Sequence, residues 1–179
     1  MRAFILPLLF SLTLAAPAMA QNKPAPAAGK PAPAAATAGP TSIGVFDDWQ
    51  AATHDEAGQK VCYAFTKPKS STPAIPGRSG VVLTVTQRQS GRDAVALSAG
   101  FEYADKATVA VDIDKTKVEL YTAKRSAFAR DGRAVVLALQ KAQKVVARSP
   151  HPQKTLVTDT FSLKGFGKAY DAIVKACPK

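Results

Sequence analysis

A two-residue hydrophobic period, repeated in short stretches, is the feature that most constrains how this chain can fold. In the stretch 81–86, Val81, Leu83 and Val85 fall on one side of an extended chain and the residues between them fall on the other. Because successive side chains of a strand point to opposite faces of the sheet, this period indicates a strand with one buried face. Strands are expected at 43–51, 59–65, 81–86, 95–101, 109–113, 118–122, 144–147 and 155–163.

These stretches are short, and turn residues such as Ser90-Gly91 and Asp114-Lys115 separate them. Short alternating strands joined by such turns are typical of antiparallel all-β domains. Two later segments have a helical period instead. The predicted fold is therefore mainly β: an antiparallel β-sandwich with a short helix and a C-terminal amphipathic helix.

The short helix is predicted over 133–142, where Asp131 is placed to accept hydrogen bonds from the first amides of the helix. The second helix is predicted at the C-terminus, with Ser162 as a candidate cap. Its apolar residues recur at the spacing of one helical face. They are Phe166, Ala169, Tyr170, Ile173, Val174 and Cys177.

The N-terminus indicates export from the cytoplasm. Arg2 supplies a positive charge, residues 4–16 are almost wholly apolar, and Ala18-Met19-Ala20 forms an A-x-A cleavage pattern. This layout predicts a signal peptide over residues 1–20, because the apolar run is too short for a membrane span. The mature protein is expected to be periplasmic or secreted and to lack a transmembrane segment. Removal of Arg2 leaves it with a net charge of +10.

Residues 21–40 consist mainly of Ala, Pro, Lys and Gly and contain no large apolar side chain. Such a segment cannot bury enough surface to offset the entropy of ordering. It is interpreted as a linker, either a semi-rigid spacer or a neutral tail. The remaining residues, 41–179, are enough to form a single β domain.

Cys62 and Cys177 are the two cysteines of the chain. In an exported domain a pair of cysteines most simply forms one disulfide, because the compartment is oxidising. Cys177 lies on the apolar stripe of the last helix and Cys62 lies in the strand 59–65. The pair is therefore expected to tie the C-terminal helix to the sheet.

The sequence contains no metal-binding His or Cys spacing, no nucleophile elbow and no phosphate-binding loop. The carboxylate pairs Asp47/Asp48 and Asp112/Asp114 could act as acid and base, but the second pair flanks a turn, where Asp is expected for backbone reasons. Trp49 is interpreted as a core residue rather than a ligand platform. We therefore expect no catalytic residue, no cofactor and no metal, and no enzyme activity.

Basic residues gather in the second half of the chain. If their strands and helix are neighbours, they form a positive surface that attracts an anionic component of the bacterial envelope or of a host surface. The alternative is a solvated surface that only keeps the protein soluble. Nucleic acid is not expected as a partner, because aromatic residues do not alternate with the basic ones. The candidate residues are Lys115, Lys117, Lys124, Arg125, Arg130, Arg133, Lys141, Lys144 and Arg148.

Six motifs follow one another in a recognisable order. They are Phe46-Asp47-Asp48-Trp49-Gln50, Val61-Cys62-Tyr63-Ala64-Phe65-Thr66-Lys67-Pro68, Ser98-Ala99-Gly100-Phe101-Glu102-Tyr103, Val118-Glu119-Leu120-Tyr121-Thr122, Ser126-Ala127-Phe128 and Thr158-Asp159-Thr160-Phe161-Ser162-Leu163-Lys164-Gly165-Phe166. This order resembles the invasion-associated locus B family of exported bacterial proteins. The chain departs from the family pattern at Ala51-Ala52, where some members have a cysteine, and at Phe128, where many have Trp.

The resemblance implies a non-catalytic envelope protein that contributes to host-cell interaction or invasion. An alternative is a periplasmic accessory or chaperone-like factor that maintains envelope integrity. A role that depends on the loop from Arg148 to Gln153 does not follow from the resemblance, because this loop departs from the turn often found in the family.

Overall fold

The computed structural model describes residues 39–179. The expected signal peptide, and all of the expected linker except Gly39 and Pro40, lie outside the described residues. Within the described part, the chain forms 11 strands in one sheet and two helices. The strands are β1 (Thr41–Phe46), β2 (Trp49–Glu56), β3 (Gln59–Thr66), β4 (Ser70–Thr72), β5 (Val82–Arg88), β6 (Gly91–Ser98), β7 (Thr108–Ile113), β8 (Thr116–Ala123), β9 (Ser126–Ala129), β10 (Lys144–Pro150) and β11 (Leu156–Ser162).

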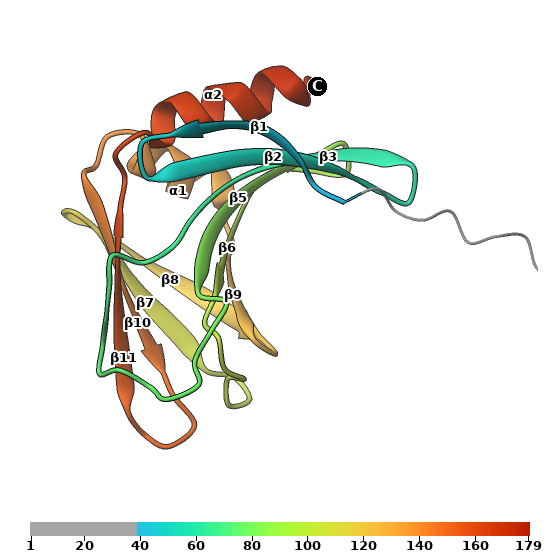
Figure 1. The fold of residues 1–179 in the computed structure, drawn as a ribbon. Coiled ribbons are helices and arrows are strands. Elements are labelled where there is room, and N and C mark those ends of the chain that lie inside the picture. Colours follow the sequence, from blue (N-terminus) through green and yellow to red (C-terminus); the bar gives the residue numbers. More distant parts are fainter. Residues whose placement is uncertain (1–38) are drawn as a thin grey trace, which may run out of the picture. The chain divides into compact units, whose positions relative to one another are not determined.

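All neighbouring strands of this sheet are antiparallel, in the order β1-β2-β3-β5-β6-β9-β8-β7-β10-β11-β4. The sheet bends strongly, so that β5, β6 and β9 stand opposite β7, β10 and β11 (Figure 1). The inward residues of the two halves meet in one core. The predicted mainly β, antiparallel class is confirmed.

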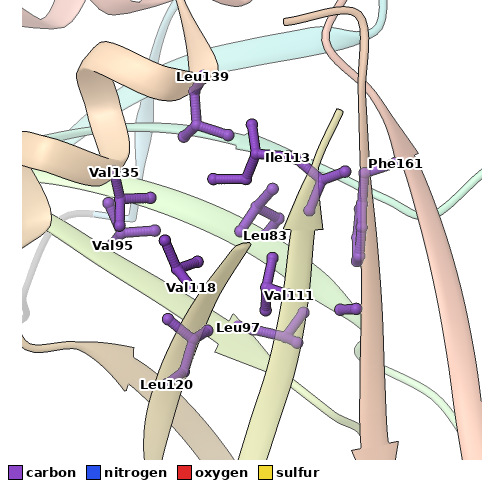
Figure 2. A pocket seen from close by; sticks show the side chains of 12 residues that line it. Leu83, Val95, Leu97, Val111, Ile113, Val118, Leu120, Val135, Leu139 and Phe161 are labelled. Carbon is purple, nitrogen blue, oxygen red and sulfur yellow. The ribbon is translucent and has the colours of Figure 1, made fainter. Parts of the chain in front are cut away.

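The core is filled by apolar side chains from both halves of the sheet and from the first helix (Figure 2). The cavity at its centre measures about 10 Å³, which is close to the smallest space that holds one water molecule. The interior of the sheet is therefore packed rather than hollowed for a ligand. The side chains around the cavity are Leu83, Val95, Leu97, Val111, Ile113, Val118, Leu120, Val135, Leu139, Val145, Ala147 and Phe161.

The expected single strand at 43–51 is wrong, because a two-residue turn at Asp47 and Asp48 divides it into β1 and β2. The turn also changes which side chains after it face the core. Phe46 and Trp49 are directly opposite each other in the hairpin, so their side chains share a face. Val45 is 70 % exposed whereas Trp49 is fully buried, although uninterrupted alternation placed them on the same side.

The first helix, α1 (Gly132–Leu139), begins one residue before the predicted start and ends three residues before the predicted end. The Asp131 carboxylate caps it, as predicted, by accepting a hydrogen bond from the Ala134 amide at 2.9 Å. The second helix, α2 (Phe166–Ala176), lies across β1, β2 and β3 (Figure 1). Ser162 does not cap α2; Gly165 precedes the helix with a φ of 88°. A Cβ atom at Gly165 would lie 1.9 Å from the carbonyl oxygen of Phe46, so only glycine fits there.

Both ends of α2 are held on the sheet. Near its start, the Phe166 ring packs against Trp49 at 4.8 Å between ring centroids. The Trp49 Nε1 donates a hydrogen bond to the Ser162 carbonyl oxygen at 3.0 Å, as expected of a tryptophan whose polar edge needs a partner in the core. At the end of α2, a disulfide joins Cys177 to Cys62 on β3, with a Cα–Cα distance of 6.0 Å.

Candidate functional site

The excess positive charge of the described residues comes from one segment. Three of the 24 basic residues and none of the 13 acidic ones precede residue 39, so residues 39–179 carry a net charge of +8. The segment 115–154 alone holds ten basic and two acidic residues, and the rest of the described chain holds eleven of each. The segment consists of β8, β9, α1, β10 and their connections, and all of the predicted basic site residues lie in it.

Three of the predicted lysines lie around one surface hollow. Lys115 is in the turn between β7 and β8, and Lys141 follows α1; both line a hollow of about 280 Å³. Lys144 begins β10 beside the same turn, because its carbonyl oxygen accepts a hydrogen bond from the Asp114 amide at 3.3 Å. All three lysines are exposed, and within the described part of the chain none of them has an acidic partner. We call Lys115, Lys141 and Lys144 the lysine patch.

Lys124 and Arg125 lie at the opposite end of β8, in its turn to β9. At a rise of about 3.3 Å per residue, this turn is roughly 25–30 Å from the turn that contains Lys115. The Arg125 guanidinium donates a hydrogen bond to the Gly100 carbonyl oxygen at 2.8 Å. The structure therefore brings Lys115, Lys141 and Lys144 together but places Lys124 and Arg125 elsewhere.

Arg148 and Arg130, two further predicted basic residues, contact neighbouring side chains of the sheet. Arg148 forms an ion pair with Asp112 at 2.6 Å, and Arg130 stacks over the Tyr121 ring at 5.1 Å. Lys117 is opposite Asp112 in the register of β7 and β8. The Asp112 carboxylate offsets the charge of Arg148, whereas the neutral ring of Tyr121 leaves the charge of Arg130 in place.

Arg133 points to a buried polar cluster under α1 and α2. The Asp93 carboxylate accepts hydrogen bonds from the Tyr170 hydroxyl at 2.7 Å and from Gln87 Nε2 at 2.6 Å, and Arg133 lies 3.4 Å from it. Burial acts to raise the pKa of Asp93, but these hydrogen bonds and the Arg133 charge outweigh it and lower the pKa below its ordinary value. Burial, and then the bond to Asp93, raise the pKa of Tyr170.

A second polar cluster in the core was missed in the sequence. Arg78 lies in the loop before β5, and its guanidinium forms a bidentate ion pair with Asp159 of β11. Ser71 of β4 donates a further hydrogen bond to Asp159 at 2.6 Å. One signal was available: Asp159 falls between Val157 and Phe161 on the inward face of β11. A carboxylate at a core position requires a buried partner.

The carboxylate pairs considered for acid–base chemistry are all engaged. Asp48 accepts a hydrogen bond from Lys69, which is the main cause of its lowered pKa, and Asp47 lies 3.3 Å from the Lys164 ammonium. Asp112 pairs with Arg148, and Asp114 accepts a hydrogen bond from the Gln143 amide at 2.8 Å. In residues 39–179, no three His, Cys, Asp or Glu side chains are grouped in a way that could hold a metal ion.

The fold and surface define a class: a mainly antiparallel β domain whose C-terminal helix is linked to the sheet by a disulfide, with its excess positive charge in the segment 115–154. No helix within 39–179 has the length and apolarity needed to cross a membrane. The sequence matches the model of the "Invasion associated locus B (IalB) protein" family over residues 49–174. The chain belongs to this family.

The solved structures include a similar fold, the crystal structure of invasion associated protein B from Bartonella henselae. The similarity has a TM-score of 0.53 and 19 % sequence identity, and it covers 74 % of this chain and 95 % of that chain. No curated protein matches the sequence at a significant level. The family and the fold thus agree with the resemblance found in the motifs.

Proposed function

We propose that the chain is a non-catalytic protein of the periplasm or of the secreted fraction that binds anionic components of the bacterial envelope or of a host-cell surface. One observation carries the proposal: the whole charge excess of the described residues lies in the segment 115–154. Within this segment Lys115, Lys141 and Lys144 lie close together. Positive charge gathered in one place attracts anionic surfaces more strongly than the same charge spread evenly. Membership in an invasion-associated family supports a role at a cell surface.

The packing of the core supports binding at the surface rather than in an internal pocket. The central cavity of about 10 Å³ is too small for an organic ligand. The signal-peptide pattern over residues 1–20 supports export, and the Cys62–Cys177 disulfide suits an oxidising compartment. These features together favour an envelope protein that acts by contact.

The test uses the mature chain, which begins at Gln21. Its binding to lipopolysaccharide and to heparin is measured at increasing salt concentration. Surface charges are screened over about 8–10 Å at physiological ionic strength, so binding is expected to weaken steeply with salt. Charge reversal at Lys141 and Lys144 is expected to weaken binding more than reversal at Lys23 and Lys30, although both pairs change the net charge equally. Equal losses from the two pairs would reject a role for the segment 115–154.

A further inference from the structure

One surface of α1 is apolar and open to solvent. Val135, Val136 and Leu139 are buried against the sheet, whereas Leu137 on the other side of α1 is 41 % exposed. Ala134 is also exposed, and Ala138 is half-buried. Ala134, Leu137 and Ala138 are spaced by three and four residues, so they form one apolar strip on the helix. Lys141 lies in the turn directly after α1, where its amide donates a hydrogen bond to the Ala138 carbonyl oxygen at 3.1 Å.

The apolar strip ends in the lysine patch. Ala138 and Lys141 line the same hollow as Lys115, and Lys144 lies beside it. Asp114 is the carboxylate in this hollow, and it accepts a hydrogen bond from the Gln143 amide rather than from a lysine. Three ammonium groups therefore remain available to an external anion next to an exposed leucine.

Other exposed apolar residues lack this combination. Val45 and Leu156 are 70 % and 54 % exposed, but neither lies beside the lysine patch. Tyr121 is 39 % exposed, and Arg130 covers its ring. Of the exposed large apolar side chains in residues 39–179, Leu137 is the one that adjoins the lysine patch.

We propose that the outer face of α1 and the lysine patch form a docking site for an anionic phospholipid bilayer. The inference deepens the proposed function and rests on it. The lysines contact headgroup phosphates, and Leu137 enters the boundary between headgroups and acyl chains, as apolar side chains of interfacial helices do. The aliphatic stems of the lysines suit this boundary because they lie along apolar surface while the charges stay in water. A soluble polyanion would use the lysines but leave Leu137 in water.

The test is sedimentation of the mature protein with vesicles of phosphatidylcholine containing phosphatidylglycerol, at an ionic strength of about 0.1 M, where the Debye length is about 10 Å. Each lysine near an anionic membrane contributes about fivefold in affinity, so replacing Lys115, Lys141 and Lys144 by Gln is expected to weaken binding about 100-fold. Leu137→Ser is expected to weaken vesicle binding about fivefold. The same variant should bind heparin as the wild type does, because its charge is unchanged.

Two matched controls locate the site. Leu156→Ser removes an exposed leucine at the start of β11, and Lys124→Gln with Arg125→Gln removes two charges at the far end of β8. The leucine control is expected to leave vesicle binding unchanged. The charge control is expected to lower it less than twofold, because the far end of β8 is more than a Debye length away. Circular dichroism confirms that each variant is folded.

The outcomes separate the two proposals. Binding to heparin and lipopolysaccharide without binding to phospholipid vesicles overturns the bilayer inference and leaves the proposed function standing. Vesicle binding that is equal in Leu137→Ser and the wild type, or that falls as much in the controls, also overturns it. Failure of the wild type to bind any of the three anionic probes overturns the proposed function itself.

Discussion

Arg78 and Asp159 form a bidentate ion pair inside the domain, with Nη1–Oδ1 and Nη2–Oδ2 distances of 2.8 and 2.6 Å. The two side chains are only 5 % and 0 % exposed. Arg78 also donates its Nε hydrogen to the Ala99 carbonyl oxygen at 2.6 Å and stacks over the Phe101 ring at 5.2 Å. One guanidinium therefore joins the loop before β5 to β11 and to the chain that leaves β6.

We expect Arg78→Met to lower the free energy of unfolding by about 3–5 kcal/mol, because it leaves the Asp159 carboxylate buried without its counter-charge. Urea unfolding of the mature protein measures this loss. The matched control is Lys69→Met, which removes an ion pair with Asp48 at the surface and should cost much less, because water screens an exposed pair. Similar losses in the free energy of unfolding from the two substitutions would show that the buried pair stabilises the fold no more than the surface pair does.

Asp93 should make stability depend on acid pH. Its pKa in the folded protein is lowered, because hydrogen bonds from Tyr170 and Gln87 and the Arg133 charge outweigh the effect of burial. The stabilisation it gives is complete above its unfolded pKa of about 3.9 and disappears as pH falls through the lower folded value. Between pH 5 and pH 2.5, the wild type is therefore expected to lose more stability than Asp93→Asn. An equal loss of stability in the wild type and in Asp93→Asn would contradict this role of Asp93.

Gly165 and Gly167 offer a paired test of the start of α2. A Cβ at Gly165 would lie 1.9 Å from the Phe46 carbonyl oxygen, and its φ is 88°, so Gly165→Ala is expected to cost at least about 2 kcal/mol. At Gly167, inside α2, nothing lies within 4 Å of a new Cβ. Gly167→Ala should raise stability by about 0.5–1 kcal/mol, because alanine favours the helix. Thermal unfolding compares the two variants. A Gly165→Ala variant as stable as the wild type would contradict the close approach of residue 165 to the Phe46 carbonyl oxygen.

The sequence was informative where one local pattern decides the structure. The alternation in β5 to β8, and the apolar stripe of α2 from Phe166 to Cys177, predicted strands and a helix because burial of one face follows directly from the period. The same reasoning failed at β1 and β2. The two Asp residues of their turn are a turn signal that the period of the apolar residues obscured, since Asp tolerates the left-handed backbone that Asp47 takes with a φ of 52°.

Other features depend on contacts between distant parts of the chain. β4 and β9 have three and four residues, too few to show a period, and their pairing with β11 and with β6 and β8 defines them. The sequence named Lys115, Lys141 and Lys144 as basic candidates. The sequence did not show that the turn after β7 lies beside the end of α1. The structure was needed to group these three lysines and to separate them from Lys124 and Arg125.

The disulfide between Cys62 and Cys177 joins residues that are 115 positions apart in the sequence. Crosslinking so long a loop stabilises the folded state by about 4–5 kcal/mol in the chain-entropy model, because the unfolded chain loses freedom. Replacing both cysteines by Ala is expected to lower the urea midpoint accordingly. Amide exchange should rise first in the last turn of α2, because the Trp49–Phe166 contact still holds the start of the helix. Mass spectrometry of the native, non-reduced protein should find the two cysteine peptides linked, and two free thiols there would contradict the pairing.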